Sequence, residues 1–111
     1  MIEGLWIVQY EGMAGNGGGV AVFIKGKILG GDTGYTYVGD YKASNAAVSA
    51  QVSVKNFLAG VPSVLGITGD FDLDIEGSIE GSVIKATGRL PKDKHAAGIA
   101  LKLTKRADLP A

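Results

Sequence analysis

The residue types that most often perform catalysis are sparse in this 111-residue chain. It has a single histidine, His95, in the charged segment Leu90–His95, and no cysteine. The absence of cysteine excludes disulfides, thiolate metal sites and thiol nucleophiles. A lone histidine in a charged loop is typical of a solvated surface residue, and no serine or threonine stands in a pattern with a base and an orienting group. We therefore expect no catalytic site and no enzyme.

Carboxylates gather in one segment, where they alternate with apolar residues. Asp70, Asp72 and Asp74 would share one face of a strand, about 6 to 7 Å apart. On an open face they stay ionised and hydrated, whereas acid–base catalysis needs one carboxyl with a raised pKa. The glycine and the spacing of a calcium loop are missing, so we expect neither a metal site nor a cofactor. The three aspartates are a candidate interaction surface; alternatively, they pair across a hairpin with Lys85 and Arg89.

Two further clusters have residue types found at binding sites. The glycine-rich run Gly15–Gly19 lacks the lysine–serine ending and the helix of a phosphate loop, so it predicts a hairpin loop. Tyr35, Tyr37 and Tyr41 would share one face of a strand. Tyrosine is favoured at ligand mouths and subunit interfaces, which adds these three residues to the candidate interaction surface, with an ordinary outer surface or an ordinary core as the alternative.

Strand patterns account for most of the chain. We predict strands over Gly4–Tyr10, Gly19–Lys25, Lys27–Gly31, Tyr35–Lys42, Ala46–Lys55, Asp70–Ile75, Ile79–Leu90 and Gly98–Lys105. A turn is expected at Glu76–Ser78, and the one helical signal is a single turn within Val61–Leu65, ending at Gly66. Eight short strands predict an all-β fold, an antiparallel barrel whose closure leaves no exposed edge, with a β-sandwich as the alternative. We expect one barrel domain over residues 1–106 and a tail over 107–111.

The interior of an eight-stranded barrel holds either packed side chains or one small ligand. The candidate lining residues are Val22, Val52, Leu73 and Leu101. A filled barrel with an exposed patch would indicate a protein that binds other proteins. A cavity of a few hundred Å³ would indicate a carrier or sensor of a small apolar ligand.

Charge and hydropathy limit the partners and the compartment. The formal net charge is zero, which argues against nucleic acid because phosphate binding leaves a basic excess. The longest apolar run, Val20–Ile24, is too short to span a membrane, and the N-terminus lacks the pattern of a secretory signal. We therefore expect a cytoplasmic protein that binds neither nucleic acid nor membrane.

The start of the chain resembles the first strand of lipocalin-like barrels. Gly4-Leu5-Trp6 matches the Gly-x-Trp signature of those barrels. There the tryptophan plugs the base of the barrel and a basic residue of the last strand packs over it. The resemblance implies this role for Trp6, with Lys105 or Arg106 making the cation–π contact.

A wider resemblance covers nearly the whole chain. The segments Glu3–Trp6, Gly19–Lys25, Ile28–Asp32 and Val61–Leu65, together with Tyr37-Val38-Gly39, resemble the GrlR family. These are small negative regulators of bacterial type III secretion gene expression. The resemblance implies a lipocalin-like, calycin-type barrel and a homodimer. It also implies a non-enzymatic role, in which the protein binds and sequesters a transcriptional activator.

The acidic motif of that family is absent here. The family carries a Glu-Asp-Glu-Asp stretch in the loop before the fifth strand, linked to binding of the activator. The matching positions are Ala43, Ser44, Asn45 and Ala46. The segment from Asp70 to Glu76 is then the alternative acidic surface.

Overall fold

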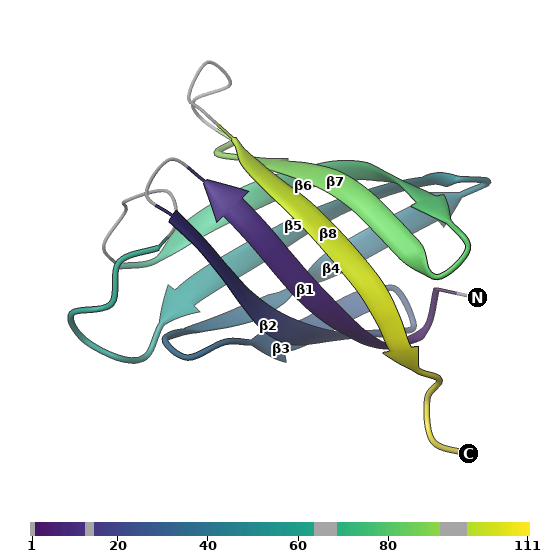
Figure 1. Ribbon diagram of the computed structural model, residues 1–111, viewed down its shortest axis with the longest axis horizontal. Helices are drawn as coiled ribbons and strands as arrows, with labels where there is room; N and C mark the ends of the chain where they lie inside the picture. Colours follow the sequence, from purple (N-terminus) through teal and green to yellow (C-terminus); the bar gives the residue numbers. More distant parts are fainter. Residues whose placement is uncertain (1, 13–14, 64–68, 92–97) are drawn as a thin grey trace.

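The computed structural model describes residues 2–12, 15–63, 69–91 and 98–111, which form a closed antiparallel barrel (Figure 1). Its strands are β1 (Gly4–Gly12), β2 (Gly15–Ile24), β3 (Lys27–Gly31), β4 (Tyr35–Ser44), β5 (Ala47–Asn56), β6 (Phe71–Glu80), β7 (Val83–Arg89) and β8 (Ile99–Ala107). Each strand pairs with the next in the sequence, and β8 pairs with β1. The predicted all-β barrel is confirmed, and the β-sandwich is not formed.

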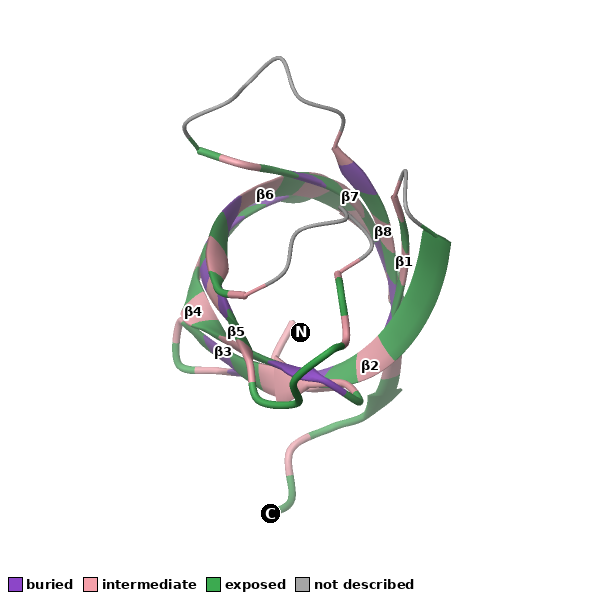
Figure 2. Ribbon diagram, turned by 90° about the vertical axis from the view of Figure 1, so that its left-hand side faces the viewer, coloured by how far each residue is buried: buried purple, intermediate pink, exposed green. Residues whose placement is uncertain are grey.

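Side-chain alternation places the core inside the barrel. Along β5, Val48, Ala50, Val52 and Val54 are buried, and the residues between them are more exposed. The other strands follow the same period of two, so buried residues face the barrel axis (Figure 2). The described residues contain no helix. Residues 61–63 of the predicted helical turn are irregular, and Val64, Leu65 and Gly66 lie outside the described part of the chain.

The first hairpin is longer than predicted, because the glycine-rich run is a strand and not a loop. Gly15–Gly19 belong to β2 and pair in register with β1, where Gly19 lies opposite Val8. Gly17 lies opposite Tyr10, and a Cβ on Gly17 would come within 2.8 Å of the Tyr10 ring. The glycine therefore leaves room for the aromatic ring that lies across it.

The turn predicted at Glu76–Ser78 is also wrong. β6 continues through these residues to Glu80, and β7 begins at Val83. Gly77 lies opposite Ala86, and a Cβ on Gly77 would approach the Lys85 carbonyl oxygen to 2.3 Å. This glycine allows the two strands to approach closely and does not reverse the chain.

Candidate functional site

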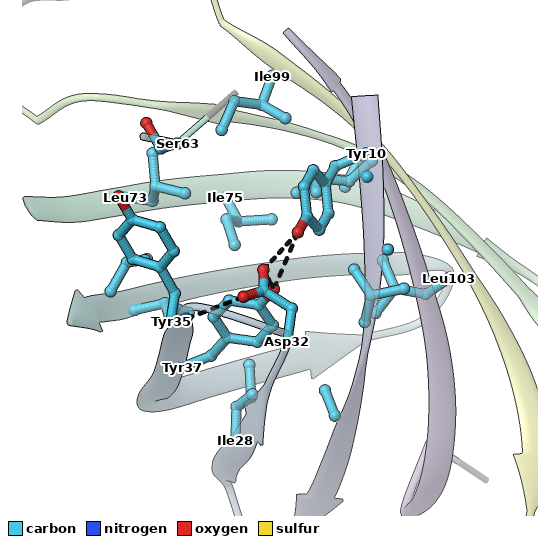
Figure 3. Close-up of a pocket in the computed structure, with 18 of the residues that line it drawn as sticks. Tyr10, Ile28, Asp32, Tyr35, Tyr37, Ser63, Leu73, Ile75, Ile99 and Leu103 are labelled. Atoms are coloured by element: carbon cyan, nitrogen blue, oxygen red, sulfur yellow. Dashed lines mark hydrogen bonds between the residues drawn. The ribbon is translucent and has the colours of Figure 1, made fainter. Parts of the chain in front are cut away.

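The interior of the barrel is open. A cavity of about 320 Å³ lies between the strands, with walls that are mainly aliphatic and aromatic (Figure 3). The prediction of a filled interior, which we made for a protein that only binds other proteins, is therefore wrong. Val52, Leu73 and Leu101 line the cavity. Val22 does not, because Ala21 and Phe23 on either side of it point inward and the alternation of β2 turns Val22 outward.

The polar centre of the cavity wall is the carboxylate of Asp32, in the loop between β3 and β4. Its Oδ1 accepts the backbone N–H groups of Gly34 at 3.0 Å and Tyr35 at 2.9 Å, which fold the loop into an Asx turn. Its Oδ2 accepts the hydroxyls of Tyr10 and Tyr37 (Figure 3). The loop thus fixes the carboxylate from behind, while two tyrosines from β1 and β4 meet it from the cavity side.

The tyrosines of β4 face the interior of the barrel, so they do not share an outer surface with Asp70, Asp72 and Asp74, and their role in binding stays a prediction. Tyr35 is buried and its hydroxyl donates to the carbonyl of Val61 at 2.7 Å. Tyr37 lines the cavity, and the Tyr41 ring packs on Phe23 with centroids 5.0 Å apart. Their shared face was predicted, but it is the inner one, because β4 alternates with Thr36, Val38 and Asp40 outward.

Burial and hydrogen bonding shift the pKa values of all three members of this cluster. Burial raises the pKa of Tyr10 to about 12, and the hydrogen bond to Asp32 adds to that effect. Burial and the same carboxylate raise the pKa of Tyr37 further still. Burial alone would raise the pKa of Asp32, but the hydrogen bonds from the two tyrosines and two backbone N–H groups outweigh it and lower that pKa. At neutral pH the cluster is therefore one carboxylate held by two neutral phenols.

Sequence reasoning missed Tyr10 and the role of Asp32. Asp32 is followed two residues later by a glycine and three residues later by Tyr35 at the start of β4, which is a recognisable Asx-turn pattern. Tyr10 lies far away in the sequence and reaches Asp32 because β1 and β3 both pair with β2. The turn was detectable from local sequence, and the contact with Tyr10 was not.

Alkaline titration tests this cluster. Phenols with raised pKa values contribute stability that is present below pH 10, the ordinary value, and is lost as the pH rises through the folded-state pKa. We expect Tyr10 and Tyr37 to remain neutral at pH 11 by phenolate absorbance. Asp32→Asn should lower the pKa of both, and Asp72→Asn on the outer face should leave it unchanged. Complete ionisation of every tyrosine below pH 11 in the folded wild type would contradict the described hydrogen bonds.

Trp6 and Phe23 pack together in the core beside the cavity. Trp6 is 1% exposed, packs against Phe23 with centroids 5.8 Å apart, and donates its indole N–H to the Ile2 carbonyl at 2.8 Å. Lys105 lies opposite Trp6 in the β1–β8 ladder, and its side chain is 16% exposed. Arg106 is exposed. The packing of a basic side chain over the tryptophan ring stays a prediction, and Lys105 is the residue positioned for it.

The outer face of β6 carries the acidic row, which we define as Asp72, Asp74 and Glu76. Asp72 accepts a hydrogen bond from the Ser53 hydroxyl at 3.1 Å. Within the described residues, none of these acids forms an ion pair, although Asp74 lies opposite Arg89. Asp70 precedes the strand and accepts the backbone N–H of Asn56 at 2.9 Å. The alternative prediction was that these carboxylates form ion pairs across a hairpin. Such pairs are not found among the residues described.

A second surface lies on the outer face of β1 to β4. Leu5, Val22, Leu29 and Val38 are aligned directly across the four strands, so their outward side chains form one continuous row. Ile7 and Val20 form a neighbouring pair. We call these six residues the apolar face. Leu29 and Val38 are 50% and 52% exposed, which is unusual for large aliphatic residues side by side on a strand surface.

Two searches of the described residues were negative. Over residues 2–12, 15–63, 69–91 and 98–111, no group of three or more acidic or histidine side chains is arranged to hold a metal ion. In the same ranges no helix is long and apolar enough to cross a membrane. His95 lies outside the described residues.

Comparison with known proteins identifies the family of this chain. No curated protein matches the chain. A family model described as "T3SS negative regulator, GrlR" matches residues 1–101, which is most of the sequence and includes all of β1 to β7. The match confirms the resemblance seen in the segments around Trp6 and Asp32. The chain therefore belongs to the GrlR family of negative regulators of type III secretion systems.

Proposed function

We propose that this protein is a non-enzymatic, cytoplasmic regulator that represses bacterial type III secretion genes by binding a transcriptional activator. The family supports the regulatory role. The observation that carries the binding mechanism is the acidic row on β6, whose carboxylates have no ion-pair partner within the described residues. A protein that binds DNA carries a basic surface, and an acidic surface of this kind complements it.

The molecular surface around the acidic row is suited to a protein partner. A groove runs over the outer surface of β4, β5 and β6, and its lining includes Asp40, Gln51, Asp72 and Asp74. The residues facing the row from β5 are the uncharged Ser49, Gln51 and Ser53. Lys27 also lines the groove and is paired with Asp40, so among the described residues the lining carboxylates without an ion-pair partner are Asp72 and Asp74.

The apolar face is proposed to bind a second copy of this chain. All eight strands are paired around the closed barrel, which favours a dimer that packs face to face over one that adds strands edge to edge. The apolar face has no charge with which to select a charged partner, and a second copy presents the same uncharged surface about a two-fold axis. The exposed Lys27–Asp40 ion pair at its border would lie in the polar rim.

The two surfaces are compatible with one assembly. β2, in the apolar face, and β6, with the acidic row, lie across the barrel from each other (Figure 2). A dimer formed through the apolar face would cover Val38 and reach the edge of the groove at Asp40, and it would leave the acidic row on β6 of each subunit exposed. The protein would then present two separate sites for a basic partner.

Repression of a reporter tests this function. In a bacterium that carries a type III secretion system, wild-type protein should reduce expression from a secretion-gene promoter. In the isosteric triple variant Asp72→Asn, Asp74→Asn, Glu76→Gln, repression of the reporter should be at least about 10-fold weaker. The variant lacks the negative charges that attract a basic partner. Protein levels are compared by immunoblot.

The matched control removes the same number of charges elsewhere. The three substitutions are Glu3→Gln just before β1, Glu11→Gln on β1 and Asp108→Asn just beyond β8. This triple variant should repress like the wild type. Equal repression by the wild type and the β6 variant would show that the acidic row is not the binding site.

A further inference from the structure

The charge of the cavity wall comes from one carboxylate, in a lining that is otherwise neutral among the described residues. The polar lining residues are Tyr10, Asn16, Asp32, Thr33, Tyr35, Tyr37 and Ser63, and none of the lining residues in the described part of the chain is a lysine, arginine or histidine. Among those residues the carboxylate of Asp32 is thus the only formal charge. The rest of the lining is apolar, including Val8, Phe23 and Ile84.

The polar cluster around Asp32 has hydrogen-bond acceptors free for a ligand and no free donor. A carboxylate has about four acceptor positions, and Asp32 uses them on two backbone N–H groups and two phenol hydroxyls. Each phenol has one proton and gives it to Asp32. The two hydroxyl oxygens approach each other at 3.5 Å, the outer limit of a hydrogen bond. Tyr10 and Tyr37 therefore have lone pairs left for a ligand, but no proton to donate (Figure 3).

The dimensions limit the ligand. A cavity of about 150 Å³ holds benzene, so by proportion about 320 Å³ accommodates roughly a dozen non-hydrogen atoms. Sites for small molecules begin near this size and combine apolar walls with a few convergent polar groups. The aliphatic walls suit an alkyl or aryl body, and the acceptor cluster suits one hydrogen-bond donor.

We propose that the barrel cavity binds a small amphipathic molecule with an apolar body and a hydrogen-bond-donating head, best a protonated amine. The head would donate to the hydroxyl oxygens of Tyr10 and Tyr37 and be attracted by the charge of Asp32. An ammonium has three N–H donors and the favourable sign of charge, an alcohol has one donor, and a carboxylate has none. A fatty acid would place its own charge near Asp32 with no cation among the described lining residues, so the site discriminates against it.

Three probes with the same chain test the inference: decylamine, 1-decanol and decanoate. At about pH 7 the first is a cation and the last an anion. By isothermal titration below their micelle concentrations, decylamine should bind most tightly and decanol next, with decanoate at least about 10-fold weaker than decylamine. Decanoate binding as tightly as decylamine, or no binding of any probe, would overturn the proposal.

Two variants locate the site. Asp32→Asn keeps an oxygen for the backbone N–H groups but removes the charge, so it should bring decylamine and decanoate to within about 3-fold of each other. Ala86→Leu fills part of the cavity from β7, opposite Gly77, and should weaken all three probes at least about 10-fold. If Ala86→Leu binds every probe like the wild type, the probes lie elsewhere and the proposal is wrong.

Surface binding is excluded by two controls. Leu29→Ser alters the apolar face, and Asp72→Asn removes a carboxylate from the acidic row. Both should bind decylamine like the wild type, and a loss in either would overturn the assignment to the cavity. The order of the three probes on wild-type protein needs no variant, so the test stands even if Asp32→Asn does not fold. Neither result depends on repression, so the cavity and the regulatory role can fail separately.

Discussion

Leu29→Asp should convert the proposed dimer into a monomer. Leu29 lies in the middle of the apolar face, aligned with Val22 on one side and Val38 on the other, and is 50% exposed in the single chain. In a two-fold dimer the substitution buries two carboxylates within one apolar interface, without a cation to pair with either. We expect the dimer dissociation constant to rise at least about 100-fold, measured by analytical ultracentrifugation.

A matched control separates this effect from a general effect of added charge. Thr87→Asp introduces the same carboxylate on the exposed face of β7, across the barrel from the apolar face. It should leave the dimer intact. Circular dichroism should show folded protein for both variants, because both positions point away from the core. A wild-type protein that is monomeric at high concentration, or a Leu29→Asp variant that remains dimeric, would contradict the proposed interface.

Trp6→Ala should have the largest effect on folding. Trp6 is 1% exposed, packs against Phe23 and donates its indole N–H to the Ile2 carbonyl. Removing a buried aromatic side chain costs about 3 to 5 kcal/mol of the free energy of unfolding, which is a large part of the stability of a small domain. Urea unfolding followed by circular dichroism measures the loss.

The conservative variant Trp6→Phe should lose less of the free energy of unfolding than Trp6→Ala. Trp6→Phe keeps an aromatic ring next to Phe23 but loses the indole hydrogen bond and some volume. We expect a loss of about 1 to 2 kcal/mol, so this variant stays folded and measurable if Trp6→Ala does not fold. A loss below about 1 kcal/mol for Trp6→Ala would show that the ring does not close the base of the barrel.

Strands with regular alternation were predictable, and those containing glycine were misplaced. β5 was found because its apolar and polar residues alternate without interruption. The glycine run of β2 and Gly77 of β6 have no side chains to alternate, so the sequence pattern stops there while the backbone ladder continues. In both places the glycine is needed because another group lies close: the Tyr10 ring at Gly17 and the Lys85 carbonyl at Gly77.

The faces of strands were harder to predict than their positions. The common face of Tyr35, Tyr37 and Tyr41 was predictable from its spacing and its direction was not, because tyrosine suits both a wet surface and a polar cavity wall. Val22 was placed inside since valine favours the core, yet its neighbours Ala21 and Phe23 occupy the interior. The direction is decided by barrel closure, which depends on all eight strands at once.

The structure divides the barrel into regions with different chemistry. The inside has an acceptor cluster around Asp32 in an apolar cavity, which suits a small donor ligand. The outside has an apolar face on β1 to β4 and an acidic row on β6, which suit two kinds of protein contact. Because Ala43, Ser44, Asn45 and Ala46 carry no charge, the acidic row is the surface on which the proposed function depends most.

Direct binding to a transcriptional activator of the secretion genes tests the proposed function of the acidic row. Both proteins are purified, and binding is followed by biolayer interferometry at low and high salt. We predict a complex that weakens as salt rises and that weakens at least about 10-fold in the Asp72→Asn, Asp74→Asn, Glu76→Gln variant, but not in the Glu3→Gln, Glu11→Gln, Asp108→Asn control. No complex with the wild type, or one that the two triple variants form equally well, would contradict it.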